Sequence, residues 1–279
     1  MMKLEFLKMH GTGNDFILFD GVEDKQLGSM DNGAFSQLAK NVCHRRFGIG
    51  ADQVLVLLPS DSADFMMRIL NADGSEVEMC GNGIRCLARY IWDREYSDKD
   101  ELDIETKAGI IRPKKNADMV RVDMGKPVLN GPAIPVKLEG KIVDHPLKID
   151  DRQFMITCVS MGNPHAVIVV DNVDDFPVSY YGPLIETHDL FPNRTNVEFI
   201  AIASRSEIKM RVWERGSGET MACGTGAAAV SVASSIKGLT DRDVTVHLPG
   251  GDLFLNWADN DHVYMTGPAV SVFKGTIEF

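Results

Sequence analysis

The sequence predicts an α/β (α+β) fold built from two pseudo-symmetric, β-rich domains, each with a central helix that starts at a cysteine. The 279 residues suit two domains, because one domain is expected for every ~150 residues. Segments with strand-like patterns outnumber helical ones. The residues around Cys80 also recur around Cys223 without a gap, which indicates two copies of one structural unit.

Strand-like segments follow one another along most of the chain. They either alternate apolar and polar residues or form short β-rich runs between turn residues. In chain order they read LEFLKMH, DFILFD, QVLVLLP, FMMRIL, ELDIET, MVRVDM, FMITCVSM, AVIVV, NVEFIAI, IKMRVW, VTVHL, DLFLNW and VYMTG. Most of each domain is therefore expected to be sheet.

Two helices are predicted, and each follows a cysteine. Residues 82–95 place apolar side chains on one face, as expected for an amphipathic helix; they are Ile84, Leu87, Ala88 and Ile91. Residues 224–236, GTGAAAVSVASSI, are apolar or small on every side. The second helix is therefore expected to be buried.

The two cysteines define an internal repeat with an offset of 223 − 80 = 143 residues. At this offset MRILNADGSEVEMCGNG (67–83) lies over MRVWERGSGETMACGTG (210–226). Met-Arg, a glutamate four residues before the cysteine and Cys-Gly-x-Gly coincide. A weaker match, which needs an insertion, relates GTGNDFILFD (11–20) to MGNPHAVIVVD (161–171). We interpret these matches as two copies of one strand–loop–helix unit.

The domain boundary is expected near GKPVLNGPAIP (125–135), where glycine and proline cluster. The expected domains are residues 1–125 and 126–267. Two similar domains that face each other leave a cleft between them, and such clefts often hold ligands. We therefore expect the active site in the interdomain cleft.

The composition limits the possible partners. The net charge is −11, and nucleic acids or anionic membranes require clustered lysine and arginine, which this chain lacks. No apolar run is long enough for a membrane span, and no export signal is visible. Five cysteines without Cys-x-x-Cys or His-x(3–5)-His spacing argue against a disulfide framework and a zinc site. The sequence thus favours reduced thiols in a cytoplasmic protein that binds small molecules or proteins.

A cysteine at a helix start can serve as an acid or base. The helix N-terminus presents unpaired N–H groups and a partial positive charge, so it stabilises anions. The thiol pKa can fall from about 8.5 into the ~3.5–7.5 range there. Each half of the chain is therefore expected to offer a possible base and a cradle for an anion.

Two such sites closing on one ligand suit inversion at a carbon next to a carboxylate. One thiolate removes the α-proton from one face, and the opposing thiol delivers a proton to the other. The helix N–H groups stabilise the negative charge that spreads onto the carboxylate. Cys80 and Cys223 are the candidates for these roles. Cys43, Cys86 and Cys158 lie within apolar segments without Gly-x-Gly, so we interpret them as small buried residues.

Two other functions deserve comparison. GTGNDF, GIGADQ and CGNG resemble fragments of nucleotide-binding loops, but none completes a dinucleotide or Walker A motif. A thiol-redox or metal-binding protein could also use Cys80 and Cys223. The absence of closely spaced cysteine or histidine counts against it, and a metal assay with thiol titration would decide.

The motifs together resemble the diaminopimelate epimerase family over nearly the whole chain. They are KMHGTGNDF (8–16), FGIGADQ (47–53), NADGSEVEMCGNGIRC (71–86), VSMGNPHAV (159–167), FPNRTNVEF (191–199), ERGSGETMACGTGA (214–227) and MTGPA (265–269). The resemblance implies a cofactor-independent epimerase that interconverts LL- and meso-2,6-diaminopimelate in lysine and peptidoglycan-precursor biosynthesis. It implies no metal, a homodimer and a C-terminal strand, residues 268–279, that returns to the first domain.

The resemblance also assigns roles to individual residues. Cys80 and Cys223 are the acid/base thiols, with His165 and Glu214 beside them. The residues implied in substrate binding are Asn14, Gln53, Asn71, Gly81, Asn82, Asn163, Asn196, Glu214, Arg215, Gly224 and Thr225. The backbone at Gly81, Asn82, Gly224 and Thr225 is expected to hold the reacting carboxylate.

The residues alone leave alternatives open. Arg215 suits a bidentate carboxylate contact, but it could form a surface ion pair. His165 could be a structural histidine, and the asparagines could be turn residues. Glu76 and Glu219 are expected to cap the helices. A related family acts on proline or hydroxyproline, but its members resemble CGHG at the first thiol, whereas this chain has CGNG.

Overall fold

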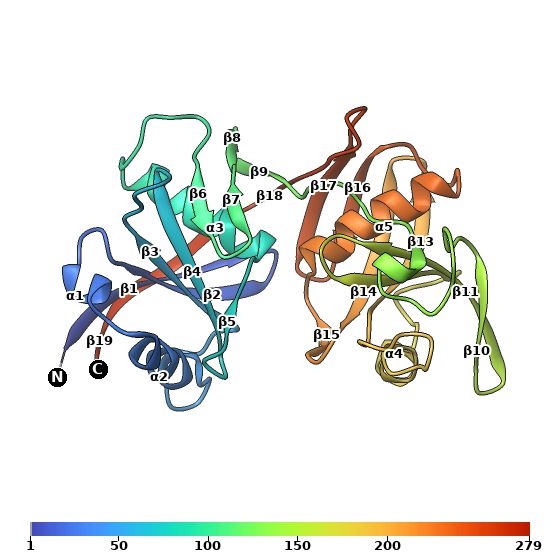
Figure 1. Ribbon diagram of the computed structural model, residues 1–279, viewed down its shortest axis with the longest axis horizontal. Coiled ribbons are helices and arrows are strands. Elements are labelled where there is room, and N and C mark those ends of the chain that lie inside the picture. Colours follow the sequence, from blue (N-terminus) through green and yellow to red (C-terminus); the bar gives the residue numbers. More distant parts are fainter. Residues whose placement is uncertain (1) are drawn as a thin grey trace. The chain divides into compact units, whose positions relative to one another are not determined.

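A computed structural model describes residues 2–279. The chain divides into two compact units (Figure 1). Residues Met1–Val122 and Gly267–Phe279 form the first unit, and Asp123–Thr266 form the second. Each unit is mostly sheet and contains a long helix that starts directly after a cysteine. The predicted fold class is thus confirmed.

One sheet forms the frame of the first unit. Its strands lie in the order β19-β1-β2-β3-β4-β6-β7, and β5 pairs with β4. The pairs β2/β3 and β4/β6 are parallel, whereas β1/β2 and β3/β4 are antiparallel. The bounds are β1 (Lys3–Gly11), β2 (Asn14–Asp20), β3 (Gln53–Leu58), β4 (Phe65–Asn71), β5 (Glu76–Val77), β6 (Ile104–Thr106), β7 (Gly109–Ile111) and β19 (Val270–Glu278).

Three helices accompany this sheet: α1 (Lys25–Gly28), α2 (Asn32–Cys43) and α3 (Gly81–Asp93). The side chain of Asp31 caps α2 by accepting a hydrogen bond from the Ala34 N–H. The helix predicted over 82–95 is α3, which begins one residue earlier and ends two residues earlier. Its apolar face is buried as predicted, and it contacts β1 to β4.

The second unit repeats the topology of the first. Its main strands lie in the order β10-β11-β12-β13-β14-β16-β17-β18, with β15 paired to β14. The pairs β12/β13 and β14/β16 are parallel, as are β2/β3 and β4/β6 in the first unit. The bounds are β10 (His145–Ile149), β11 (Arg152–Ser160), β12 (Pro164–Val169), β13 (Asn196–Ser204), β14 (Glu207–Glu214), β15 (Gly218–Thr220), β16 (Asp243–Leu248), β17 (Gly251–Trp257) and β18 (Val263–Gly267). Every strand-like segment predicted from the sequence contains a strand.

The remaining elements are short or helical. They are the hairpin strands β8 (Lys114–Asn116) and β9 (Met119–Asp123), the 3-10 turn η1 (Gly131–Ala133), and the helices α4 (Val178–Glu186) and α5 (Gly224–Ile236). The helix α5 contacts β11, β12, β13, β16 and β17, so the sheet curves around it. Its residues Gly226–Ser234 are all buried, as its sequence predicted.

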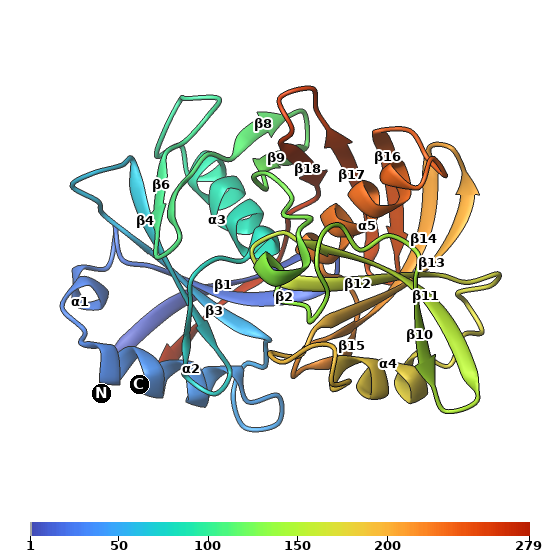
Figure 2. The same ribbon diagram turned by 45° about the vertical axis from the view of Figure 1, so that its right-hand side comes forward.

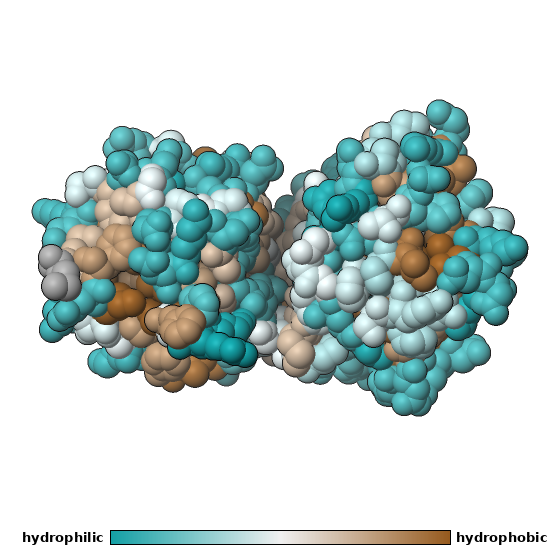
Figure 3. Space-filling model, turned by 90° about the horizontal axis from the view of Figure 1, so that it is seen from below, coloured by the Kyte–Doolittle hydropathy of each residue, from teal (hydrophilic) through white to brown (hydrophobic). Residues whose placement is uncertain are grey.

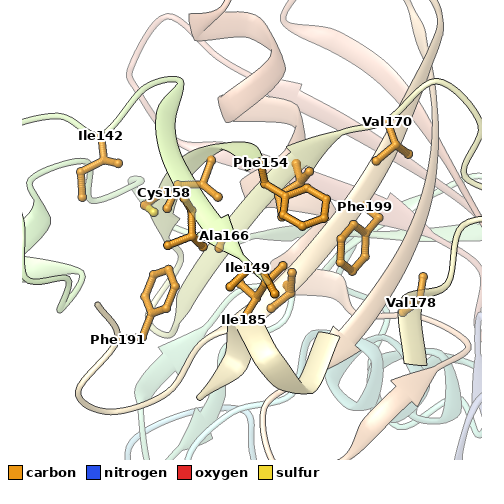
Figure 4. Packing of buried hydrophobic residues seen from close by; sticks show 14 of the residues in the cluster. Ile142, Ile149, Phe154, Cys158, Ala166, Val170, Val178, Ile185, Phe191 and Phe199 are labelled. Atoms are coloured by element: carbon orange, nitrogen blue, oxygen red, sulfur yellow. The ribbon is translucent and has the colours of Figure 1, made fainter. Parts of the chain in front are cut away.

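A hydrophobic core lies where α4 packs on the sheet of the second unit. It contains the aromatic rings of Phe154, Phe176 and Phe199 together with aliphatic residues such as Ile185. Figure 4 shows side chains from strands and helices, among them Phe154, Phe199 and Ile185, coming together in this core. The sheet of the second unit is therefore covered on both faces, by α5 and by α4.

The two ends of the chain lie together in the first unit. The strand β19 pairs antiparallel with β1, and Met2 and Phe279 exchange backbone hydrogen bonds. Figure 2 shows the same neighbourhood of the N- and C-termini from another side. On the face displayed in Figure 3, hydrophobic residues form small patches among hydrophilic ones. Within residues 2–279, no helix is long and apolar enough to cross a membrane.

Candidate active site

Both predicted catalytic cysteines cap their helices. Cys80 is the N-cap of α3, and its sulfur accepts a hydrogen bond from the Gly83 N–H at 3.4 Å. Cys223 caps α5 in the same way, with the Gly226 N–H at 3.4 Å. Each cysteine therefore lies beside the N–H groups of a first helical turn, which have no acceptor within the helix. These groups include those of Gly81, Asn82, Gly224 and Thr225, the predicted carboxylate cradle.

Glu76 and Glu219 do not cap the helices, so this expectation was wrong. Glu76 forms an ion pair with Arg68, and Glu219 forms one with Arg211. The first pair joins β4 to the short strand β5, and the second joins β14 to the short strand β15. In both units these two strands precede the cysteine. The cysteine sulfur has already taken the capping position. The two ion pairs are related by the 143-residue offset and so extend the repeat.

In the first unit, Asn14 connects the Cys80 thiol to the sheet. The amide oxygen of Asn14 accepts hydrogen bonds from the Cys80 sulfur, 3.8 Å away, and from Asn82 Nδ2 at 3.2 Å. Asn14 Nδ2 donates to Asp52 Oδ2 at 2.8 Å. Because the donor end of the amide is held by Asp52, its oxygen faces the cysteine. We call Asn14, Gln53, Asn71 and Cys80–Asn82 the first half-site.

Gln53 and Asn71 lie opposite each other on β3 and β4. Gln53 Nε2 donates to Asn71 Oδ1 at 2.9 Å, and Asn71 Nδ2 donates to Ser75 Oγ at 3.0 Å. Two amide oxygens of this half-site, Gln53 Oε1 and Asn82 Oδ1, are buried and accept no hydrogen bond from residues 2–279. Unsatisfied buried acceptors are rare, so both oxygens are suited to a ligand that donates.

A charged network supports the first half-site, and sequence analysis gave it no role. Lys8 is buried, and its Nζ binds Asp15 at 2.5 Å and the Gly50 carbonyl. Arg45 bridges Asp15 and Asp52. Although burial alone would raise the pKa of Asp15, hydrogen bonds from Arg45 and Lys8 lower it to about 2. The only sequence signal was the position of these residues inside or beside the motifs KMHGTGNDF and FGIGADQ.

Arg85 is a second residue that sequence analysis missed. It is fully buried on α3, and it donates to the carbonyls of Gly81 and Pro268 and to Thr12 Oγ1. Burial lowers the pKa of Arg85 to about 10, while attraction to the Cys80 and Cys86 thiolates opposes this shift. A positive charge thus lies near Cys80. The signal was an arginine between Ile84 and Cys86 on an otherwise apolar stretch.

In the second unit, Glu214 is next to Cys223. The Cys223 thiol and the Thr220 hydroxyl both donate hydrogen bonds to the Glu214 carboxyl group. The distance from Thr220 Oγ1 to Glu214 Oε1 is 2.5 Å. Burial raises the pKa of Glu214, and these hydrogen bonds lower it only in part. We call Asn163, His165, Asn196, Glu214, Arg215 and Cys223–Thr225 the second half-site.

His165 is fully buried in this half-site. Its Nδ1 lies 2.6 Å from Glu198 Oε1, and its Nε2 lies 3.0 Å from Asn163 Oδ1. The buried Asn196 accepts the Arg215 N–H through Oδ1 and donates to the Pro164 carbonyl. His165 therefore contacts Asn163 directly, and Asn196 contacts Arg215. Sequence analysis assigned nothing to Glu198.

The Arg215 side chain is exposed, and within residues 2–279 it forms no ion pair. Its Nη1 donates to the Asn193 carbonyl at 3.2 Å. The alternative of a surface ion pair is therefore not realised. Most of the guanidinium donors face solvent and are available to an anion.

Cys223 does not have the lowered pKa that a helix start can give. Burial raises its pKa well above the usual value, and the charges of Glu214 and Glu198 add to this shift. Hydrogen bonds from Thr225 and the Gly226 N–H favour the thiolate but do not outweigh burial. This shift favours the thiol form of Cys223 at neutral pH, which suits the thiol of the predicted thiolate–thiol pair.

The other three cysteines are buried in the core, as predicted. Burial raises the pKa of each to about 12; they are Cys43, Cys86 and Cys158. These thiols stay protonated at neutral pH and have packing roles.

Comparison with known proteins identifies the family. The sequence model described as "Diaminopimelate epimerase" matches residues 6–130 and 157–272. The chain belongs to the diaminopimelate epimerase family. The diaminopimelate epimerases of Carboxydothermus hydrogenoformans and Moorella thermoacetica are 56% and 52% identical to it, over 98% of this chain and 98% of each relative. This membership makes the chain an isomerase of the epimerase type.

Solved structures share the fold at low sequence identity. A PhzF-family phenazine biosynthesis protein from Bacillus anthracis gives a TM-score of 0.73 at 18% identity, with 100% of both chains covered. A hydroxyproline epimerase from Agrobacterium vitis, with bound trans-4-hydroxy-L-proline, gives 0.68 at 15% identity, covering 99% of this chain and 92% of that one. These likenesses show that the chain shares its two-unit fold with both structures.

Proposed function

We propose that this chain interconverts LL- and meso-2,6-diaminopimelate by a two-base mechanism that uses Cys80 and Cys223. The observation that carries the proposal is the repeated placement of a cysteine as the N-cap of a buried helix. Family membership supplies the substrate, because the relatives are named for diaminopimelate. The proposal requires both half-sites to bind one substrate molecule.

The helix starts would hold the reacting carboxylate. The N–H groups of Gly81, Asn82, Gly224 and Thr225 are donors without acceptors in their helices. When the α-carbon loses its proton, negative charge spreads onto the carboxylate, where these donors and the helix dipoles stabilise it. This electrostatic stabilisation makes a weak carbon acid accessible to a thiolate.

The two sulfurs would exchange protons with opposite faces of the same carbon. A Cys80 thiolate takes the α-proton as the C–H bond breaks, and the electron pair moves toward the carboxylate. The Cys223 S–H bond then breaks, and its proton forms the new C–H bond on the other face. After one turnover Cys80 is a thiol and Cys223 a thiolate, which is the starting state for the reverse reaction. The raised pKa of Cys223 supports its role as the first donor.

The remaining polar groups suit a substrate with two amino-acid ends. The buried oxygens Gln53 Oε1 and Asn82 Oδ1 accept hydrogen bonds, so they fit ammonium groups. Arg215 has an exposed guanidinium that can form two parallel bonds with the distal carboxylate. Asn196 holds the Arg215 backbone in place.

One incubation tests the reaction and its main rival. Purified protein, without added pyridoxal phosphate or metal, is given LL-diaminopimelate in one sample and L-proline in another. Chiral chromatography should detect meso-diaminopimelate and no D-proline. Inversion of proline alone would replace the proposal with a proline racemase.

Isotope incorporation tests the two-base mechanism. In D2O, early meso product should carry deuterium at the inverted centre, while recovered LL-substrate stays mostly protiated. The reason is that one sulfur removes hydrogen and the other, already exchanged with solvent, delivers it. Comparable early deuterium in substrate and product, measured by mass spectrometry, would contradict opposed roles for Cys80 and Cys223.

We also infer a homodimer in the cytoplasm. The strand β19 is at one end of the first unit's sheet, and its residues Val270, Val272 and Phe273 expose apolar side chains. An apolar edge strand is prone to pair with another chain, and a second copy would cover it. Sedimentation of the wild type and of Phe273→Lys tests the dimer, which the lysine should weaken. A monomeric wild type would exclude it.

A further inference from the structure

Glu198 is a buried carboxylate that the proposed mechanism does not use. It lies on β13, has no exposed surface, and contacts His165 through Oε1 at 2.6 Å. Its second oxygen, Oε2, is buried and accepts no hydrogen bond from residues 2–279. A buried charge is costly unless it is fully paired. Glu198 is only partly satisfied, so its presence needs a reason other than stability.

The repeat shows that this position does not need a charge for the fold. A Cβ atom at Gly83 would lie 3.0 Å from Leu55, whereas one at Gly226 would lie 2.8 Å from Glu198 Oε1. The two glycines occupy equivalent places in α3 and α5, related by the offset of 226 − 83 = 143 residues. Leu55 thus fills in the first unit the place that Glu198 fills in the second. The same scaffold forms with an apolar residue there.

Glu198 lies within reach of the second half-site. A Cβ atom added at Gly226 would lie 2.8 Å from Glu198 Oε1 and 3.2 Å from the Cys223 Cβ. Glu198 Oε1 is therefore within about 6 Å of that Cβ, a range over which charges alter each other's ionisation. The ionisable groups that interact with this pocket are His165 on β12, Glu214 on β14, Cys158 on β11 and Cys223 at the start of α5.

Glu198 holds one side of the His165 ring, and Asn163 holds the other. Both ring nitrogens face oxygen atoms, those of Glu198 and Asn163. In this arrangement Nδ1 can donate to Glu198 and Nε2 can donate to Asn163 Oδ1. The negative charge of Glu198 attracts such a ring, and the partial positive charge at the start of α5, beside Gly226, stabilises the negative charge of Glu198. Since Asn163 Oδ1 is bound by His165, the Asn163 NH2 group is left to face a ligand.

We propose that Glu198 is a positioning residue of the epimerase. It holds His165 as a donor to Asn163, which orients Asn163, and it places a second carboxyl group near Cys223. Glu198 touches neither the substrate nor the reacting carbon. This role rests on the proposed function only for its effect on turnover, because the states of His165 and Cys223 can be measured without substrate.

The test uses Glu198→Gln, which keeps the shape and removes the charge, and Glu198→Leu, which copies the first unit. In Glu198→Gln, kcat for diaminopimelate should fall on the order of a hundredfold and KM should rise, because Asn163 loses the orientation that His165 gives it. Without substrate, iodoacetamide should alkylate Cys223 faster at pH 7 than in the wild type, with Cys80 as the reference peptide. Nitrogen NMR of the wild type should show both His165 nitrogens protonated, with His165→Gln used to assign the signal.

Asp252→Asn is the matched control, since it removes the carboxylate partner of His247 in the same unit. It should leave kcat, alkylation and the His165 signal unchanged. If both Glu198 variants fail to fold, the wild-type NMR still decides: an unprotonated His165 nitrogen overturns the proposal. Unchanged kcat and unchanged Cys223 alkylation in a folded variant also overturn it. A wild type that does not epimerise diaminopimelate, but shows the alkylation and NMR results, refutes the proposed function and leaves the positioning role standing.

Discussion

The two half-sites share one scaffold but lie beside buried groups of opposite charge, Arg85 in the first unit and Glu198 in the second. The repeat offset relates Arg85 to Ala228, Leu55 to Glu198 and Asn71 to Glu214. Cys80 is therefore near a cation and neutral amides, whereas Cys223 is near two carboxyl groups. A symmetric fold supplies two sulfurs at equivalent places, and three substitutions make their chemistry unequal. The difference favours Cys80 as the first base and Cys223 as the first acid.

The largest expected effect comes from removing either sulfur. Cys80→Ala and Cys223→Ala should each lower kcat by roughly 10²–10⁴-fold, because each removes one proton-transfer group. Both variants should remain folded, since losing a helix cap costs about 1 kcal/mol. Chiral product analysis and thermal melting measure the two quantities.

Cys158→Ala is the control for both cysteine variants. It should keep its activity and lose about 1 kcal/mol of stability, because it removes a buried group outside the half-sites. Full turnover in either Cys80→Ala or Cys223→Ala would end the two-thiol mechanism.

The next effect concerns Arg215, the exposed guanidinium of the second half-site. Arg215→Lys should lower kcat/KM for diaminopimelate by about 10–100-fold, because the lysine cannot form two parallel bonds with a carboxylate. Arg205→Lys, at an exposed ion pair with Asp241, should have no effect. Equal kinetics in both variants would remove Arg215 from substrate binding.

The next effect is on stability, and it differs between Asp15 in the first unit and Glu214 in the second. The folded pKa of Asp15, about 2, is below its ordinary 3.8, so its stabilisation is present above pH 4 and disappears as the pH falls toward 2. Asp15→Asn should therefore lower the free energy of unfolding by about 2 kcal/mol at pH 7, and by little at pH 2. The pKa of Glu214 is shifted in the opposite direction, upward, so ionisation of Glu214 at neutral pH does not stabilise the fold. Glu214→Gln should accordingly not lose stability at pH 7 through this charge.

Urea unfolding of Asp15→Asn and Glu214→Gln at pH 7 and of Asp15→Asn at pH 2 provides the comparison. A loss for Asp15→Asn that persists at pH 2 would show that the charge network is not its cause.

The smallest effect is expected at Arg85. Arg85→Met should lower kcat/KM about tenfold at pH 7, because a nearby cation favours the Cys80 thiolate. The loss should shrink as the pH rises, and Arg85→Lys should retain more activity. Arg89→Met, which breaks an exposed ion pair on the same helix, should leave the rate unchanged. A pH-independent loss in Arg85→Met would mean that Arg85 acts only through its hydrogen bonds.

Local patterns in the sequence predicted the parts of the fold that depend on neighbours in the chain. Alternating residues marked the strands, and Cys-Gly-x-Gly marked both helix starts. The strand β10 and the helices α2 and α4 were among the elements missed. In α2 the buried residues Phe35, Leu38, Ala39 and Val42 stand at helical spacing, so the pattern was present there and was overlooked. The motifs also bring Asn14 to Cys80, and His165 to Asn163.

What the sequence could not predict depends on burial and distant contacts. The raised pKa of Cys223 follows from desolvation and from the charges of Glu214 and Glu198, which lie on neighbouring strands and not beside it in the chain. Asn14 is oriented by Asp52, and Arg85 is tied to Pro268 near the end of the chain. A residue's charge is visible in the sequence, but its partner and its exposure are properties of the folded chain.

The return of β19 to the first unit has a consequence for protein synthesis. During translation the second unit, Asp123–Thr266, leaves the ribosome before the last strand of the first. The nascent chain then holds a complete second half-site while α3 still lacks the Pro268 contact of Arg85. The residues made first therefore reach their final structure last. A message truncated before the codon for Gly267 would yield a finished second unit attached to an unfinished first.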